Sequence, residues 1–572
     1  MTRSVLVMAL VAVPMLLAAQ DAPKPQTVNA ASVPATTLPL KLAPKPTKAA
    51  MSVEDLMTRL YIFADDSMMG REAGTLGSVK ATDYLAAEAK RIGLVPAGEN
   101  GTYFQTLPLK QRRVDPMSTF IAGTAPLTFG TEWAISGNTT INKPELETVY
   151  GGVLGDSAAQ ISPEQAAGKL VLMRMPASQE AIGAVLSNAT LGPSTAAAVG
   201  IILPPQVQGL LGYVLRPGVT VDDGMAPARV YVGASAVSKL FTKGIDSLTI
   251  GDAGAKVALN AIVDMKDSPF AARNVIGILP GSDNTLKSQY VAIGAHSDHV
   301  GVSPRAVDHD SVLVFNRIVR PGGAEDSQKM GTAEEFAVVN AELAKLRETS
   351  APRRDSIFNG ADDDGSGSMA VLVIAEYMAS MKTKPKRSTL FIWHVGEEKG
   401  LWGSAYFTER PTVPRDSIVA QLNMDMVGRG AQTDQTGMSA DGKVLRGGPD
   451  YLQLVGSRRL STELGDIVER VNTGSKHNFT FDYAMDANGH PMNIYCRSDH
   501  YEYAKWGIPV TFFTTGGHSA YHQLTDEPQY IDYPHMLRVS KLVSDVALEL
   551  GNMAKRPVVD QPKMNPRGVC KQ

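Results

Sequence analysis

The chain has 572 residues, which is more than a single domain of ordinary size needs. Hydrophobic residues make up 44% and charged residues 20%, close to the soluble globular average, which excludes a collagen, a coiled coil or a disordered chain for most of the length. The net charge of −3 is unlike that of a strongly basic nucleic-acid-binding protein, so we expect no nucleic-acid partner. The two cysteines, Cys496 and Cys570, exclude a disulfide-rich scaffold and a zinc–thiolate site.

The N-terminus has the pattern of a targeting segment. Arg3 precedes an apolar run over residues 5–19, which is too short to span a bilayer comfortably. Small residues near Ala19 suit cleavage, so we expect a signal peptide over residues 1–19, with an uncleaved membrane anchor as the alternative. Residues 20–50 are rich in Pro, Ala, Thr and Lys and predict an extended linker. We therefore expect a secreted or periplasmic protein that makes no membrane contact after signal removal.

The next part of the chain predicts helices and then an accessory domain. Residues 52–95 are typical of helices, and we assign residues 51–118 to the first part of a larger domain. Residues 119–265 contain no histidine, are rich in Gly, Val and Ala, and predict a β-rich inserted domain. Their apolar runs around residues 168–172 and 196–202 resemble the protease-associated domain.

Residues 266–555 alternate apolar runs with helical patterns, which is the signature of a mostly parallel sheet flanked by helices in the α/β class. Strands are predicted at 274–279, 290–295, 389–395, 418–424 and 509–513, and helices at 333–348, 368–381 and 534–553. Residues 302–358 form an unusually long polar connection, a length that is often functional. Residues 556–572 are expected to be a C-terminal tail.

Acidic and histidine residues follow several of these strands. In chain order they are His296 and Asp298, the run Asp362-Asp363-Asp364, Glu397 with Glu398, Asp425, and His522 with Asp526. Taken singly, such residues are usually caps, turns or solvated faces. Ligands of open α/β sheets, however, bind beyond the carboxyl ends of the strands, where unpaired buried carboxylates would cost several kcal/mol. A cation would remove that cost, and carboxylates with imidazoles suit zinc or a similar ion, alone or as a bridged pair.

Six motifs in order resemble the co-catalytic zinc exopeptidases, the family of bacterial zinc aminopeptidases and glutamate carboxypeptidase. They are Ala295-His296-Ser297-Asp298, Gly360-Ala361-Asp362-Asp363, Gly396-Glu397-Glu398, Asn423-Met424-Asp425-Met426, Arg497-Ser498-Asp499-His500 and Tyr521-His522. The resemblance covers roughly residues 55–115 and 270–550, and a protease-associated insertion between the two blocks is also seen in this family.

The resemblance implies a site with two Zn²⁺ ions and five ligands. One ion would take His296 and Asp425, the other Glu398 and His522, and Asp362 would bridge them. Three further roles are implied: Asp298 orients His296, Glu397 is the general base, and Tyr495 stabilises the oxyanion. The remaining residues near the motifs are interpreted as supporting or core residues, namely His299, His394, His500 and His518, with Asp526 orienting the loop of His522.

The implied function is a metallo-aminopeptidase that acts on peptide substrates. A carboxypeptidase or dipeptidase is the first alternative and would need an arginine clamp, for which Arg429 and Arg497 lie near the motifs. A non-catalytic receptor-like binding protein and a one-zinc glutaminyl-cyclase-like transferase are further alternatives, and the full ligand set argues against both. Two features depart from the family: the length of residues 302–358, and Cys496, which has only Cys570 as a possible partner where family members often carry a nearby disulfide.

Overall fold

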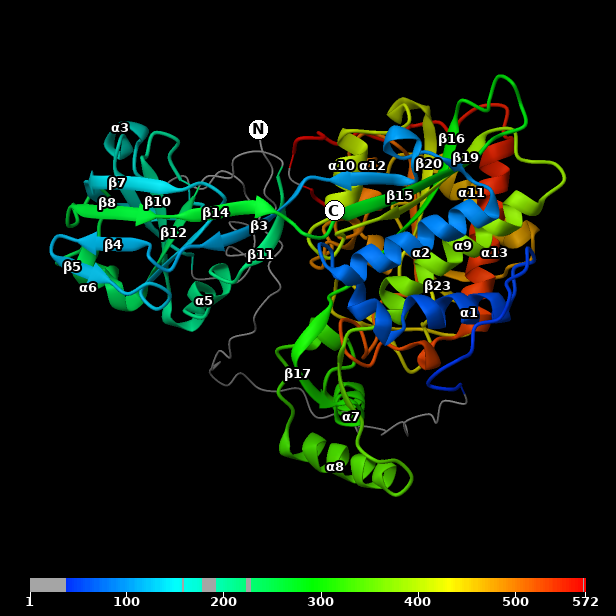
Figure 1. Cartoon of the computed structure of the whole chain (residues 1–572), viewed down its shortest axis with the longest axis horizontal. Coiled ribbons are helices and arrows are strands. Elements are labelled where there is room, and N and C mark those ends of the chain that lie inside the picture. The colour runs from blue at the N-terminus through cyan, green and yellow to red at the C-terminus, as the bar shows by residue number, and fades with distance from the viewer. Residues whose placement is uncertain (1–37, 157–158, 177–191, 223–227, 569) are drawn as a thin grey trace. The chain divides into compact units, whose positions relative to one another are not determined.

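The computed structural model describes residues 38–156, 159–176, 192–222, 228–568 and 570–572. The described residues divide into two compact units (Figure 1): the first is Pro108–Pro269, and the second consists of residues 38–107 and Phe270–Gln572. The expected signal peptide and the first part of the expected linker lie outside the described residues. No described helix is both long and apolar enough to cross a membrane.

The end of the expected linker is folded onto the second unit. The Lys41 ammonium lies 3.0 Å from Asp65 and 3.1 Å from Asp66, and the Tyr61 hydroxyl donates to the Pro39 carbonyl at 2.5 Å. Residues from 38 onward therefore belong structurally to the unit that follows them.

The second unit is built on one mixed sheet that contains nine of the described strands. In sheet order these are β1 (Val95–Pro96), β15 (Ala272–Leu279), β19 (Ser388–His394), β16 (Tyr290–His296), β20 (Ile418–Met424), β25 (Val510–Thr514), β23 (Tyr451–Val455) and β24 (Thr480–Asp482), with β2 (Phe104–Leu107) also paired to β15. The four central strands β19, β16, β20 and β25 are parallel, whereas β15 and β23 run antiparallel to their central neighbours. The predicted α/β fold is confirmed, with antiparallel strands added at both edges.

Helices cover both faces of this sheet because the central strands are buried along their whole length. One face packs against α1 (Val53–Phe63), α2 (Leu76–Ile92), α9 (Gly367–Ser380), α11 (Thr462–Gly474) and α13 (Tyr533–Asn552) (Figure 1). The other face packs against α10 (Trp402–Glu409) and α12 (His500–Ala504). Helix α2 ends at Gly93, whose φ of 86° is the left-handed cap conformation that glycine adopts without strain.

The long connection between the first two motifs is an ordered lobe of the same unit. It contains β17 (Val302–Asp308), α7 (His309–Val319), the short turn Gly323–Asp326, α8 (Ala333–Arg347) and β18 (Arg354–Ile357). Helices α7 and α8 lie side by side (Figure 1) and share a small core of Val314, Val319 and Val339. We call residues 302–358 the insert lobe.

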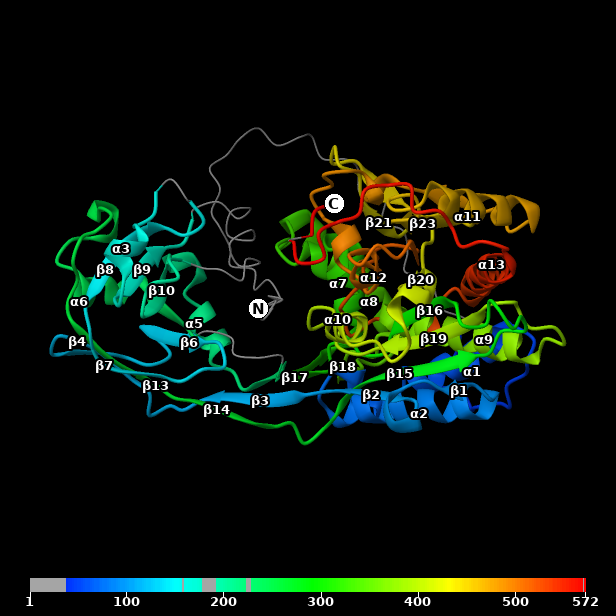
Figure 2. The same cartoon turned by 90° about the horizontal axis from the view of Figure 1, so that it is seen from above.

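The first unit is rich in β-strands, as the composition predicts. Its five-stranded sheet has the order β6 (Trp133–Ser136), β12 (Arg229–Gly233), β10 (Ala198–Leu203), β9 (Leu170–Arg174) and β8 (Thr148–Val153). A four-stranded sheet contains β5 (Ala125–Leu127), β4 (Thr119–Ala122), β13 (Val257–Ala261) and β7 (Ile141–Leu146), of which β4, β13 and β7 are labelled in Figure 2. A third sheet is formed by β11 (Gly218–Val221), β3 (Leu109–Val114) and β14 (Val263–Asp267). The first unit begins at Pro108, earlier in the chain than the expected residue 119. Its assignment as a protease-associated domain stays a prediction.

The first unit can be excised because its flanking strands already pair. Leu107 of β2 lies opposite Ala272 of β15, and the excised unit has apolar cores of its own. We expect a chain in which a short glycine-containing turn replaces residues 108–269 to fold with a melting temperature within about 5 °C of the full chain, a change of roughly 1 to 2 kcal/mol. Circular dichroism melting and metal analysis test this. Loss of cooperative unfolding or of metal binding contradicts the independence of the two units.

Candidate metal centre

The predicted site residues are brought together by the parallel strands. The carboxyl ends of neighbouring parallel strands lie at one edge of a sheet, which is where ligands bind in α/β folds. His296 ends β16, Glu397 and Glu398 follow β19, Asp425 follows β20, and His522 lies in the loop after β25.

The run of three aspartates is held in a buried loop before α9. The backbone N–H groups of Asp362 and Asp363 both donate to the Asp526 carboxylate, at 3.0 and 3.1 Å. Asp526 therefore holds the aspartate loop, whereas it was expected to orient the loop of His522. The Asp364 carboxylate accepts the N–H of His296 at 3.0 Å, which ties the same loop to the end of β16.

The aspartate between the two histidines is Asp363, not the expected Asp362. Asp363 Oδ1 lies 3.2 Å from His296 Nε2, and its Oδ2 lies 3.0 Å from His522 Nε2. The Asp362 carboxylate is engaged elsewhere: it accepts the Gly428 N–H at 2.7 Å and faces His518. The physical reason is local, because these contacts hold the Asp362 side chain away from His296 and His522.

Two groups of potential metal ligands result, and Asp363 belongs to both. One group is His296, Asp363 and Asp425, and the other is His299, Asp363, Glu398 and His522, with the ligand atoms of each group within 4.8 Å of one another. His296 Nε2 is 3.5 Å from Asp425 Oδ1, and His522 Nε2 is 3.0 Å from Glu398 Oε2. The pairing of His296 with Asp425 and of Glu398 with His522 is the arrangement that the resemblance implies.

His299 lies in the second group, although it was expected to be a supporting residue. Its Nδ1 is 2.8 Å from Glu398 Oε1, and the side chain is fully buried. Its position three residues after His296, just beyond the end of β16, was the available signal. By contrast, His394 and His500 are core residues as expected: His394 contacts the Tyr503 hydroxyl and His500 stacks on Phe512.

The cluster carries more negative charge than its histidines balance. Burial alone would lower the pKa of His296, but Asp425 and Asp363 raise it well above its usual value. Burial raises the pKa of Glu397 far above its ordinary range, even though the charge of His296 lowers it. Carboxylates in this position are stabilised by any nearby cation.

The donor atoms fit divalent cations. Three of them are buried without a hydrogen-bond partner: His296 Nε2, Asp363 Oδ2 and Asp425 Oδ1. Such atoms are costly unless something else satisfies them. Imidazole nitrogens together with carboxylate oxygens are the ligands that zinc takes in catalytic sites, and a carboxylate common to two groups suits a pair of ions.

Asp298 supports the loop of the two glutamates. Its carboxylate accepts the N–H groups of Gly396 at 2.7 Å and Glu397 at 3.2 Å. His296 Nδ1 faces the backbone carbonyl of Asp298 at 3.1 Å, and the carboxylate is farther, at 3.8 Å. Asp298 thus fixes the His296 ring through its main chain, and it positions Glu397 through its side chain.

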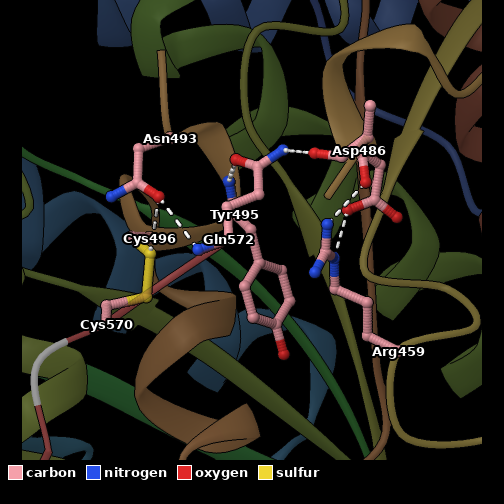
Figure 3. The surroundings of a disulfide bond; sticks show 8 residues. Arg459, Asp486, Asn493, Tyr495, Cys496, Cys570 and Gln572 are labelled. Carbon is pink, nitrogen blue, oxygen red and sulfur yellow. Dashed lines mark hydrogen bonds and ion pairs between the residues drawn. A yellow bond between two sulfur atoms is a disulfide. The ribbon is translucent and has the colours of Figure 1, made fainter. Parts of the chain in front are cut away.

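Tyr495 lies in an apolar core and not in the ligand cluster (Figure 3). The side chain is 2% exposed, the Arg459 guanidinium lies 4.6 Å from its ring, and its N–H donates to the Gln572 side chain. The adjacent Cys496 forms a disulfide with Cys570, the only partner that the composition allowed. This disulfide and the bond to Gln572 anchor the C-terminal tail beside Tyr495.

Tyr521 lies beside the cluster, although the sequence predicts no separate role for it. Its ring stacks on His522 with centroids 4.1 Å apart and an interplanar angle of 26°. Its hydroxyl accepts a bond from Arg497 at 3.4 Å. Adjacency to His522 was the only signal in the sequence.

Comparison with known proteins identifies the second half of the chain. The sequence profile of Peptidase family M28 matches residues 274–547, which include every residue of the two ligand groups. We call this matched segment the M28 domain.

Relatives of the M28 domain are similar over part of their length. Leucine aminopeptidase 1 from Paracoccidioides brasiliensis strain Pb03 is 28% identical over 200 residues, which are 33% of this chain and 46% of the relative. The same protein from Colletotrichum graminicola is 28% identical over 201 residues, 34% of this chain and 45% of the relative. The chain thus spans about half the length of the curated relatives it matches. The solved aminopeptidase from Aneurinibacillus sp. strain AM-1 is 17% identical, with a TM-score of 0.48 over 90% of this chain and 97% of that one.

The two neighbouring aspartates allow a matched test of the shared ligand. Asp363→Asn removes the charge that both groups share, so we expect the bound metal to fall from about two ions per chain to below one. Asp362→Asn changes only a side chain behind the ligands, so we expect an affinity loss of about 10- to 100-fold that excess zinc overcomes. Metal analysis after dialysis at two zinc concentrations measures both. Full metal content in Asp363→Asn would assign the bridge elsewhere.

Proposed function

We propose that the protein is a secreted or periplasmic exopeptidase that uses two zinc ions to remove N-terminal residues from peptides. The observation that carries this proposal is the buried cluster in the M28 domain, in which Asp363 is common to two groups of histidine and carboxylate ligands. Glu397 lies beside a member of that cluster and contributes to neither group, which suits a general base rather than a ligand.

The roles of the residues follow from their positions. His296, Asp363 and Asp425 would hold one ion, and Asp363, Glu398 and His522 the other, with His299 beside them. When bound, the ions supply Lewis-acid activation of water and of the peptide carbonyl. Glu397 accepts the proton of the attacking water and returns it to the leaving amine. Asp298 holds the backbone of Glu397 and so keeps this base in place.

Two observations support the choice of aminopeptidase and of compartment. The similar curated proteins are named leucine aminopeptidases, which favours that activity over the carboxypeptidase and dipeptidase alternatives. The disulfide between Cys496 and Cys570 suits an oxidising compartment, in agreement with the signal peptide expected over residues 1–19.

Metal dependence is the first test of this function. We expect purified protein to hold about two divalent ions per chain and to hydrolyse leucine p-nitroanilide. Removal of the ions with a chelator should abolish hydrolysis, because the water and the peptide carbonyl then lose their Lewis acid, and added zinc should restore it. Elemental analysis and activity on the same sample provide the measurement. Full activity with one ion or none contradicts the proposal.

Variants of the two adjacent glutamates distinguish the general base from the metal ligand. Glu397→Gln keeps the size of the side chain but cannot accept a proton, so kcat should fall about 10²- to 10⁴-fold with both ions retained. Glu398→Gln is the matched control, and it should weaken one metal site and recover activity in excess zinc. Metal content and kcat are measured side by side. If Glu397→Gln loses an ion while Glu398→Gln keeps two, the two roles are reversed.

A further inference from the structure

Two arginines from distant parts of the chain are attached to the segments that carry the metal ligands. Arg429 follows Asp425 by four residues, and the N–H of the preceding Gly428 donates to the Asp362 carboxylate. Arg317 lies on α7 of the insert lobe, where its neighbour Asn316 donates to the side chain of Gln523 at 3.0 Å. Gln523 is the residue after His522, so α7 is tied to the loop of a ligand.

Both guanidinium groups have a buried donor that nothing accepts. The Nη1 atoms of Arg317 and Arg429 are buried without a hydrogen-bond partner, and the Arg429 side chain is only 9% exposed. The nearest acid to Arg429 is Asp434, whose Oδ2 is 4.0 Å from Nε, beyond hydrogen-bond distance. That oxygen already accepts the N–H groups of Gly430 and Ala431. Unmade bonds of a buried cation are costly.

Other arginines in or near the insert lobe have hydrogen-bond acceptors for their guanidinium groups. Arg353 makes two bonds of 2.6 Å to the Glu527 carboxylate, and Arg347 lies 2.6 Å from Asp308. Arg497, which was considered as a clamp, is paired with Glu325 of the lobe at 2.5 Å. Arg320 and Arg354 of the lobe lack a carboxylate but donate to the carbonyls of Lys329 and Ala306. By contrast, the Nη1 atoms of Arg317 and Arg429 have no acceptor at all.

The two arginines also repel each other. Burial lowers the pKa of Arg317, and the positive charge of Arg429 lowers it further. Nearby Asp434 and Tyr530 act in the opposite direction but do not restore it. An anion held by both groups would remove the repulsion and satisfy the unpaired donors. A planar carboxylate matches the fork of a guanidinium particularly well.

We propose that Arg317 and Arg429 bind the carboxylate of a short peptide substrate, so that the enzyme prefers small peptides with a free C-terminus. This rests on the proposed function. We choose a substrate carboxylate over a free anion because both arginines are attached to segments that carry metal ligands. Arg429 follows Asp425 in the chain, and α7 is bonded through Asn316 to Gln523, next to His522. The insert lobe thereby supplies one half of a specificity site.

The test compares Leu-Gly-Gly as the free acid with its C-terminal amide. We expect the zinc-loaded wild type to favour the acid by about 10- to 100-fold in kcat/KM, the range for a hydrogen bond to a charged group. Arg317→Gln should bring this ratio close to one, and Arg317→Lys, which keeps the charge without the fork, should lower it by a smaller factor. Arg305→Gln, an exposed arginine of the same lobe, is the matched control and should keep the wild-type ratio.

A binding measurement separates failure of this site from failure of the proposed function. The two peptides and inorganic phosphate are each added to zinc-loaded Glu397→Gln, with and without Arg317→Gln, and the melting temperature is recorded. A larger increase with the free acid than with the amide, lost on Arg317→Gln, supports the site even if no peptide is cleaved. Equal increases, or an acid-to-amide ratio that a folded Arg317→Gln leaves unchanged, overturn it. Stabilisation by phosphate without any preference for the acid assigns a free-anion site and also overturns it.

Discussion

The concentration of negative charge at the ends of β16, β19 and β20 is the constraint on which the rest of the site depends. The Asp363 carboxylate lies 3.2 Å from His296 and 3.0 Å from His522. Asp425 is grouped with His296, and Glu398 is grouped with His522. Burying carboxylates at this density is unfavourable unless cations and donors compensate it. Much of the surrounding structure can be understood as that compensation.

Part of the compensation comes from backbone and side-chain donors that fix the loops. Asp526 receives the N–H groups of Asp362 and Asp363, so the shared ligand is positioned by its main chain. Arg71 is fully buried and donates to the carbonyls of Ser297, at 3.1 Å, and Gly360, at 2.8 Å. One guanidinium therefore joins the loop after His296 to the loop of the aspartates. Burial lowers the pKa of Arg71 to about 10, against the raising effect of the nearby acids, and this still leaves the side chain charged at neutral pH.

The insert lobe is connected to the same framework. His309, at the start of α7, and Arg353, before β18, both contact the Glu527 carboxylate, which is adjacent to Asp526. Residues near the start and near the end of the lobe thus contact one side chain, which is adjacent to Asp526. A lobe anchored in this way can present Arg317 in a fixed position, which a free loop of the same length would not do.

What the sequence by itself determined is the set of local patterns and their order. The predicted strands at 274–279, 290–295, 389–395 and 418–424 correspond to β15, β16, β19 and β20, because long apolar runs bounded by polar loops specify buried strands. The convergence of His296, Glu398, Asp425 and His522 followed from parallel strands that end at one edge.

Tertiary contacts alone decided which of three adjacent aspartates faces His296 and His522, since Asp362, Asp363 and Asp364 are chemically alike and differ only in the groups that surround them. They also decided that Tyr495 lies in a core beside Arg459, and that the charge of Arg429 lowers the pKa of Arg317, more than a hundred positions earlier in the chain. Neither a side chain's burial nor its distant neighbours are encoded in local periodicity.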